Sequence, residues 1–324
     1  MRELGAIRAA PGGARPHPAG RHRLVERGLT LARRRDLQRG AALALLALAV
    51  GTLALLVARH WDELRTAPWR LEPGRLLLGL ALQAAAVGLD ALVWVDICHG
   101  LGAGWNPRRD LRVYAYSLLA RRLPGAVWHV LGRAAFYSDA GLGRRVGLMG
   151  SVIEAGLIVL TGVAIALASF PDLWPLGALA ALSLLAVGPP IFRPAMRRLL
   201  RGGAEWLPPP GRLYRWILLY TLAWLVGCLG AFLQFDALYP LEPSLFPHFV
   251  WAATSSIVAS GAVVIVPGGL GVRELGLTAL MGEVIPPGVA AALAVAYRVA
   301  IATIEVLWSL GVILILRPGR ARVD

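Results

Sequence analysis

The chain has 324 residues, of which 57% are hydrophobic and only 16% are charged, and its mean hydropathy is +0.63. A soluble domain is usually about one quarter charged, so this composition excludes a large soluble catalytic domain and predicts a polytopic membrane protein. The net charge of +14 comes from arginine alone, because the chain contains no lysine. These arginines separate the apolar stretches, a distribution that indicates membrane topology and not nucleic-acid binding.

Residues 1–39 precede the first apolar stretch and contain ten arginines and a run rich in proline and glycine. Their low hydrophobicity and high charge predict a disordered cytoplasmic tail. Beyond this tail, apolar stretches of about 20 residues predict six full membrane spans. The spans are expected at residues 40–58, 76–97, 147–168, 174–192, 213–238 and 288–316.

Two further apolar stretches, residues 111–137 and 249–285, are interrupted by residues that stop helices. The interruptions contain Pro124 and Gly125 in the first stretch, and Pro267, Gly268, Gly269 and Gly271 in the second. A broken helix at membrane depth must face protein or a watery cavity, because lipid cannot satisfy its free backbone groups. Each stretch is therefore predicted to form a re-entrant helical hairpin.

The distribution of arginine predicts the orientation. Residues 1–39, 98–146, 193–215 and 317–324 hold ten, eight, six and three arginines, whereas residues 59–75 hold four. This bias places both termini, including a short tail at 317–324, on the cytoplasmic side of the cytoplasmic membrane. Residues 40–170 and 174–316 then have opposite topologies, so we expect an all-α bundle with an inverted repeat and one broken hairpin in each half.

Charged residues inside the apolar spans are the candidate functional groups. Asp90, Glu154, Arg298 and Glu305 each lie within a span, where an unpaired charge costs about 2.5–3.5 kcal/mol. Arg273 and Glu274 follow the second break, at the start of a predicted helix whose free N–H groups favour an anion. Ion pairing that only stabilises the bundle is the alternative interpretation of these charges.

Two motifs carry a family resemblance. Residues 267–274, PGGLGVRE, with Tyr297 and Arg298 in the last span, form the more specific motif. Residues 123–128, LPGAVW, with Arg133 and Glu154, form the weaker one. Together they resemble the lysylphosphatidylglycerol synthase transmembrane, or flippase-like, domain family. This resemblance implies a polytopic protein that moves lipids between leaflets. The synthases of the family continue into a soluble aminoacyl-transfer domain, which we expect to be missing because the sequence ends eight residues after Leu316.

The resulting hypothesis is a lipid flippase for an anionic headgroup, of the phospholipid or polyprenyl-phosphate type. Guanidinium groups suit this cargo because they grip phosphate through two parallel hydrogen bonds. Carboxylates nearby would balance the arginines or carry a coupling proton. The expected binding residues are Arg133, Arg273 and Arg298 for the phosphate, with Glu154, Glu305 and Glu274 beside them.

Two other functions stay open. A secondary transporter of a small soluble anion would use the same repeat and the same arginines. A non-enzymatic subunit would instead dock a lipid-modifying or glycosyl-transfer enzyme on the basic cytoplasmic face. No nucleophile–base set, metal-ligand spacing or phosphate-binding loop is visible, so we expect no catalytic residues, no metal and no cofactor.

Overall fold

The computed structural model describes residues 57–122, 128–170, 175–183, 208–262 and 271–317, and a few single residues between 51 and 55 and between 186 and 194. All of them belong to one compact unit, Leu45–Asp324. The described residues are helical or in turns and contain no strand. The prediction of an all-α bundle is confirmed for this part of the chain. The expected tail at residues 1–39 lies outside it.

Four of the helices are long and apolar enough to cross a membrane. With 25 to 29 residues each, they are about 40 Å long, against a hydrocarbon core of about 30 Å. Four of the six predicted spans are therefore confirmed. The span expected at 40–58 lies mostly outside the described residues, and of the span expected at 174–192 residues 175–183 are described and helical. The four helices are α3 (Pro73–Gly100), α6 (Arg144–Ala168), α8 (Pro210–Leu238) and α11 (Pro287–Ile315).

Each predicted hairpin is observed as two short helices on either side of the expected interruption. The first contains α4 (Pro107–Ala120) and α5 (Trp128–Asp139), and the second contains α9 (Phe246–Ala262) and α10 (Val272–Met281). Residues 123–127 and 263–270, which include most of the predicted break residues, lie outside the described part of the chain. Gly271 is described: it precedes α10 with a φ of 86°, a conformation that glycine adopts without strain. Two shorter elements, α2 (Trp61–Thr66) and the 3-10 helix η2 (Pro243–Leu245), lie in the connections.

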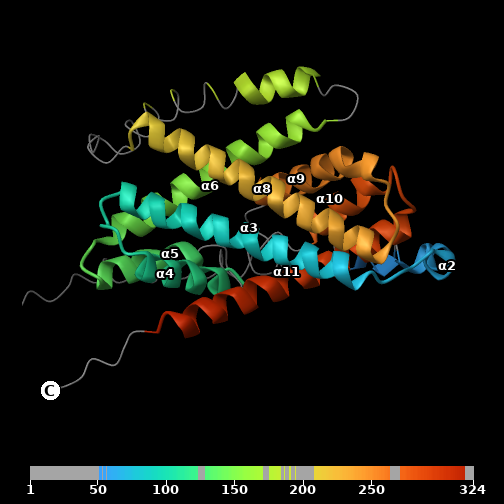
Figure 1. The fold of residues 1–324 in the computed structure, drawn as a ribbon, viewed down its shortest axis with the longest axis horizontal. Helices are drawn as coiled ribbons and strands as arrows, with labels where there is room; N and C mark the ends of the chain where they lie inside the picture. Colours follow the sequence, from blue (N-terminus) through green and yellow to red (C-terminus); the bar gives the residue numbers. More distant parts are fainter. Residues whose placement is uncertain are drawn as a thin grey trace, which may run out of the picture. The chain divides into compact units, whose positions relative to one another are not determined.

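Helices α3 and α8 pack along most of their lengths (Figure 1). Their backbones approach closely at two glycines, because a Cβ built on Gly79 would lie 2.7 Å from the carbonyl oxygen of Gly230. Arg75, at the start of α3, pairs with Asp236 near the end of α8, while Asp96, near the end of α3, pairs with Arg215 near the start of α8. The two helices therefore run antiparallel.

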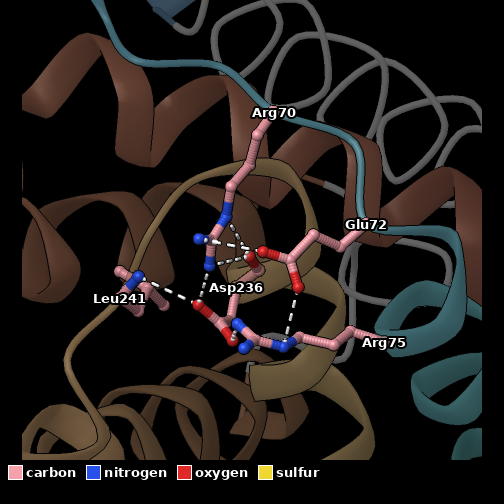
Figure 2. A network of polar contacts seen from close by, with 5 residues as sticks. All are labelled: Arg70, Glu72, Arg75, Asp236 and Leu241. Atoms are coloured by element: carbon pink, nitrogen blue, oxygen red, sulfur yellow. Dashed lines mark hydrogen bonds and ion pairs between the residues drawn. The ribbon is translucent and has the colours of Figure 1, made fainter.

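Polar clusters connect α3 and α8 at both ends of this pair. Figure 2 shows the cluster around Asp236, whose carboxylate accepts hydrogen bonds from Arg70 at 2.7 Å, from Arg75 at 2.5 Å and from the backbone N–H of Leu241 at 3.1 Å. At the opposite end, Asp96 accepts from Arg215 and from the indole N–H of Trp216, the latter at 2.6 Å. Both carboxylates are nearly buried, so each cluster is a fixed attachment between the two helices.

The remaining helices pack around this antiparallel pair (Figure 1). Helix α6 packs on α5 and on α9, and α11 packs on α10 and on α4. The long helix that follows each hairpin thus contacts one short helix of that hairpin and one short helix of the other hairpin. One apolar core, with Phe235, Phe249 and Met281, joins α8 to the second hairpin and α11, and another, with Trp94 and Tyr137, joins α3 to the first hairpin.

Candidate functional site

A cavity of about 190 Å³ lies among the central parts of α3, α8 and α11. Its polar lining contains three uncharged groups, Gln83, Tyr220 and Tyr297, in addition to charged side chains. The hydroxyl of Tyr220 is buried and has no hydrogen-bond partner among the described residues. Because buried polar groups are usually paired, this hydroxyl is available to pair with a polar group inside the cavity. The lining consists of Gln83, Ala86, Val87, Asp90, Arg121, Ile158, Tyr220, Ala223, Trp224, Gly227, Cys228, Ala231, Ala253, Ile257, Arg273, Tyr297, Ile301 and Glu305.

Two arginines reach this cavity from the two helix breaks. Arg121 directly follows the last residue of α4, where the first interruption begins. Arg273 is the second residue of α10, directly after the second interruption. The breaks therefore bring one guanidinium from each half of the chain to the same cavity.

Arg273 is oriented by two neighbouring side chains. Its guanidinium lies over the ring of Tyr297, 5.3 Å from the centroid, and donates a hydrogen bond to the tyrosine oxygen at 3.1 Å. The hydroxyl of Tyr297 donates in turn to Gln83 Oε1 at 3.4 Å. This chain of contacts connects α10, α11 and α3, and it leaves other N–H groups of Arg273 for a ligand.

Glu305 brings a carboxylate to the cavity and ties the first break to α11. Its Oε2 atom accepts a hydrogen bond from Arg122 at 2.6 Å. Arg122 is the neighbour of Arg121, so this ion pair also limits where the cavity arginine can move. Asp90, on α3, contributes the second carboxylate of the lining.

Glu274 and Arg298 set the start of α10. The backbone N–H of Gly271 donates to Glu274 Oε2 at 2.6 Å, which satisfies a helix N-terminal donor. The other carboxylate oxygen lies 3.0 Å from Nε of Arg298 in an ion pair. Neither residue lines the cavity, and their contacts lie at the start of the helix that carries Arg273.

Arg133 and Glu154 form a separate buried ion pair between α5 and α6. Arg133 is only 1% exposed, and its guanidinium lies 3.7 Å from the centroid of the Trp94 ring. Its Nε–H also donates to the hydroxyl of Ser117 at 3.0 Å. The pair is enclosed by protein and is absent from the cavity lining.

The comparison with protein families agrees with the motifs at the two breaks. The model of the family described as "Lysylphosphatidylglycerol synthase TM region" matches residues 43–309, most of the chain. The chain belongs to this family. A search of curated proteins found no match. The members of this family share the transmembrane region of a lipid synthase. Together with the four long apolar helices, this membership identifies a multi-pass membrane protein with a role connected to lipids.

The matched region of this lysylphosphatidylglycerol synthase TM family member contains every residue that lines the cavity. Of the binding residues expected from sequence, Arg273 and Glu305 lie in the lining. The others, Arg133, Arg298, Glu154 and Glu274, form ion pairs outside it. In the described part of this family member, no group of three or more His, Cys, Asp or Glu side chains could hold a metal ion.

Sequence reasoning assigned no binding role to Arg121, Asp90, Gln83 or Tyr220, all of which line the cavity. Arg121 was visible as part of the first interruption and Asp90 as a charge within a span. Gln83 and Asp90, seven residues apart on α3, share a helix face with Ala86 and Val87 of the lining. That spacing was the available signal, although the sequence did not show which face of α3 is lined by the cavity.

Proposed function

We propose that this protein moves a lipid with an anionic headgroup between the leaflets of the cytoplasmic membrane. The observation that carries the proposal is the convergence of Arg121 and Arg273 in one polar cavity at the central parts of the long helices. Two guanidinium groups can together replace the hydration of a phosphate, because each offers paired N–H donors. The acyl chains would remain in the bilayer, since a cavity of about 190 Å³ holds a headgroup but not a complete lipid.

An inverted repeat would give this cavity access to either leaflet, as in other membrane transporters. Its support is a two-fold pattern of contacts: exchanging α3 with α8, α4 with α9, α5 with α10 and α6 with α11 reproduces the same pairs of packed helices. The end clusters follow the pattern too. The separation in sequence between Asp96 and Asp236 equals the separation between Arg75 and Arg215. In both ion pairs, the arginine of one half pairs with the aspartate of the other half. Reciprocal contacts are typical of a two-fold interface.

The first test is leaflet exchange in proteoliposomes that contain headgroup-labelled phosphatidylglycerol or phosphatidylcholine. A membrane-impermeant quencher reports which lipids have reached the outer leaflet. We expect the wild-type protein to exchange phosphatidylglycerol faster than phosphatidylcholine, and Arg121→Gln and Arg273→Gln each to reduce phosphatidylglycerol exchange by about 10-fold or more, the loss of one charge-assisted contact.

Arg145→Gln is the matched control, because Arg145 is exposed and does not line the cavity. This variant should exchange lipid at the wild-type rate. If the two cavity variants exchange lipid at the wild-type rate, the arginines are not part of the mechanism. If the wild-type protein exchanges no lipid, the flippase proposal is wrong.

A small soluble anion is the second candidate substrate, because the cavity volume would hold such an ion completely. The same vesicles loaded with labelled phosphate distinguish the two. Phosphate efflux without lipid exchange would favour an anion transporter.

A further inference from the structure

Asp90 differs from the other carboxylates that are buried in the helical bundle or line the cavity. Six of these carboxylates each have an arginine partner: Asp96, Asp110, Glu154, Asp236, Glu274 and Glu305. Asp90, in contrast, has no ion pair or hydrogen bond within the described ranges. It lies in the middle of a membrane-spanning helix and lines the cavity.

An ionised carboxylate without a partner at membrane depth is expensive, so Asp90 must take up a cation or bear that cost. The cations that line the cavity together with Asp90 are Arg121 and Arg273. These are also the two guanidinium groups that the proposed function assigns to the headgroup. An ionised Asp90 and a bound phosphate would therefore compete for the same arginines.

The groups facing Asp90 from the surrounding helices determine how strong this competition is. The titratable groups that line the cavity with Asp90 are Arg121 at the end of α4, Tyr220 and Cys228 on α8, Arg273 on α10, and Tyr297 and Glu305 on α11. Tyr114 on α4 and Glu154 on α6 lie outside the lining and interact with Asp90 electrostatically. Glu154 and Glu305 are carboxylates already held by Arg133 and Arg122. Asp90 is thus the cavity carboxylate whose charge can change without breaking an ion pair.

We propose that Asp90 is a proton-binding site coupled to the headgroup site, so that a proton and an anionic lipid are carried together. The inference rests on the proposed lipid function and names its coupling ion. Protonation of Asp90 frees Arg121 and Arg273 for the phosphate, and release of the proton returns a competing carboxylate to the cavity. The proton adds to a carboxylate oxygen and leaves as the same proton, so no covalent bond of the lipid changes.

Linkage makes this coupling reciprocal: if a proton strengthens lipid binding, then lipid binding must draw a proton onto the protein by the same factor. Couplings between two sites are typically about 5-fold to 150-fold in affinity. Purified protein in weakly buffered detergent should therefore take up protons when dihexanoyl phosphatidylglycerol is added. A pH indicator dye measures that uptake.

The decisive experiment compares wild-type protein with Asp90→Asn across pH 5.5 to 8.5, in both proton uptake and phosphatidylglycerol exchange. Wild-type exchange should fall by about 5-fold or more as the pH rises, whereas Asp90→Asn should exchange lipid at a rate independent of pH and take up no proton. Asparagine is nearly isosteric and uncharged, and Asp90→Ser provides a second variant if the first fails to fold.

Two controls separate Asp90 from other carboxylates. Asp139→Asn changes an exposed carboxylate at the end of α5 and should behave as wild type. Glu305→Gln alters the paired carboxylate of the cavity and should retain the pH dependence at whatever rate it exchanges lipid.

Each alternative outcome overturns a distinct part of the argument. If Asp90→Asn keeps the wild-type pH dependence, or if Glu305→Gln alone removes it, Asp90 is not the proton site, while lipid exchange still stands. Dependence on sodium in place of pH would also reject the proton. Absence of exchange by the wild-type protein at every pH would reject the lipid function together with its coupling.

Discussion

Two ion pairs of arginine with glutamate lie beside the hairpins, and the order of the two charges along the chain is opposite in the two halves. In the first half, Arg133 on α5 pairs with Glu154 on α6. In the second half, Glu274 on α10 pairs with Arg298 on α11. Each pair joins the second short helix of a hairpin to the long helix that follows. The interpretation of these four charges as bundle-stabilising pairs therefore fits their geometry, while their binding role stays a prediction.

Removing one member of such a pair should cost more than removing both charges. Arg298→Ala leaves Glu274, which is 5% exposed, without its partner, and we expect a loss of about 3–5 kcal/mol in the free energy of unfolding. The double variant Arg298→Ala/Glu274→Gln removes the stranded charge and should recover part of that loss. Thermal unfolding in detergent measures both, with the exposed Arg145→Ala as the control. A double variant no more stable than the single one would contradict the pairing argument.

At the scale of helices, the antiparallel α3–α8 pair is the element that holds the two halves together. Close approach at Gly79 and Gly230 brings the two backbones into contact, and a polar cluster fastens each end (Figure 2). The cavity lies beside the middle of this pair, between its two fixed ends.

A methyl group at the glycine contact should weaken this attachment. In Gly79→Ala the new Cβ would lie 2.7 Å from a backbone oxygen, so α3 and α8 must separate, at a cost of about 1–3 kcal/mol. Gly88→Ala is the matched control on the same helix, because its Cβ would meet the Trp308 side chain at an ordinary 3.8 Å and should gain up to about 1 kcal/mol in helix propensity. Thermal unfolding in one detergent should show a lower melting temperature for Gly79→Ala and an unchanged or higher one for Gly88→Ala. Equal melting temperatures would argue against a tight α3–α8 contact.

Helix positions were predictable from sequence because apolar length and helix-breaking residues act locally. The described spans and the two helix pairs follow the predicted ranges closely. The partners of charged residues were not predictable in the same way, because they depend on which helix faces meet. Arg298 and Glu305 on α11 were both expected in the headgroup site. In the structure Arg298 contacts Glu274 of α10 and Glu305 contacts Arg122, which lies 183 residues earlier.

The predicted orientation of the protein in the membrane depends on the number of arginines in each loop. In the structure, some of the arginines that were counted as loop residues lie inside the helical bundle. Among the arginines of residues 98–146, Arg121 lines the cavity, and Arg122 and Arg133 pair with Glu305 and Glu154, so these residues are not free loop charges. The remaining arginines of this segment still favour a cytoplasmic location. Antiparallel packing of α3 and α8 is independent support for halves of opposite topology.

The turns that follow the two hairpins offer a direct test of inversion. Ala140 lies in the turn between α5 and α6, and Glu283 lies in the corresponding turn between α10 and α11; both are exposed. In an inverted repeat these equivalent turns face opposite sides of the membrane, whereas in a parallel repeat they face the same side. The native cysteines, Cys98 and Cys228, are buried, so the wild-type protein supplies the unlabelled background. With an impermeant maleimide, Glu283→Cys should react in intact cells, and Ala140→Cys should react only after the membrane is opened. Labelling of both variants from the same side would exclude the inverted repeat and, with it, the access of one cavity to both leaflets.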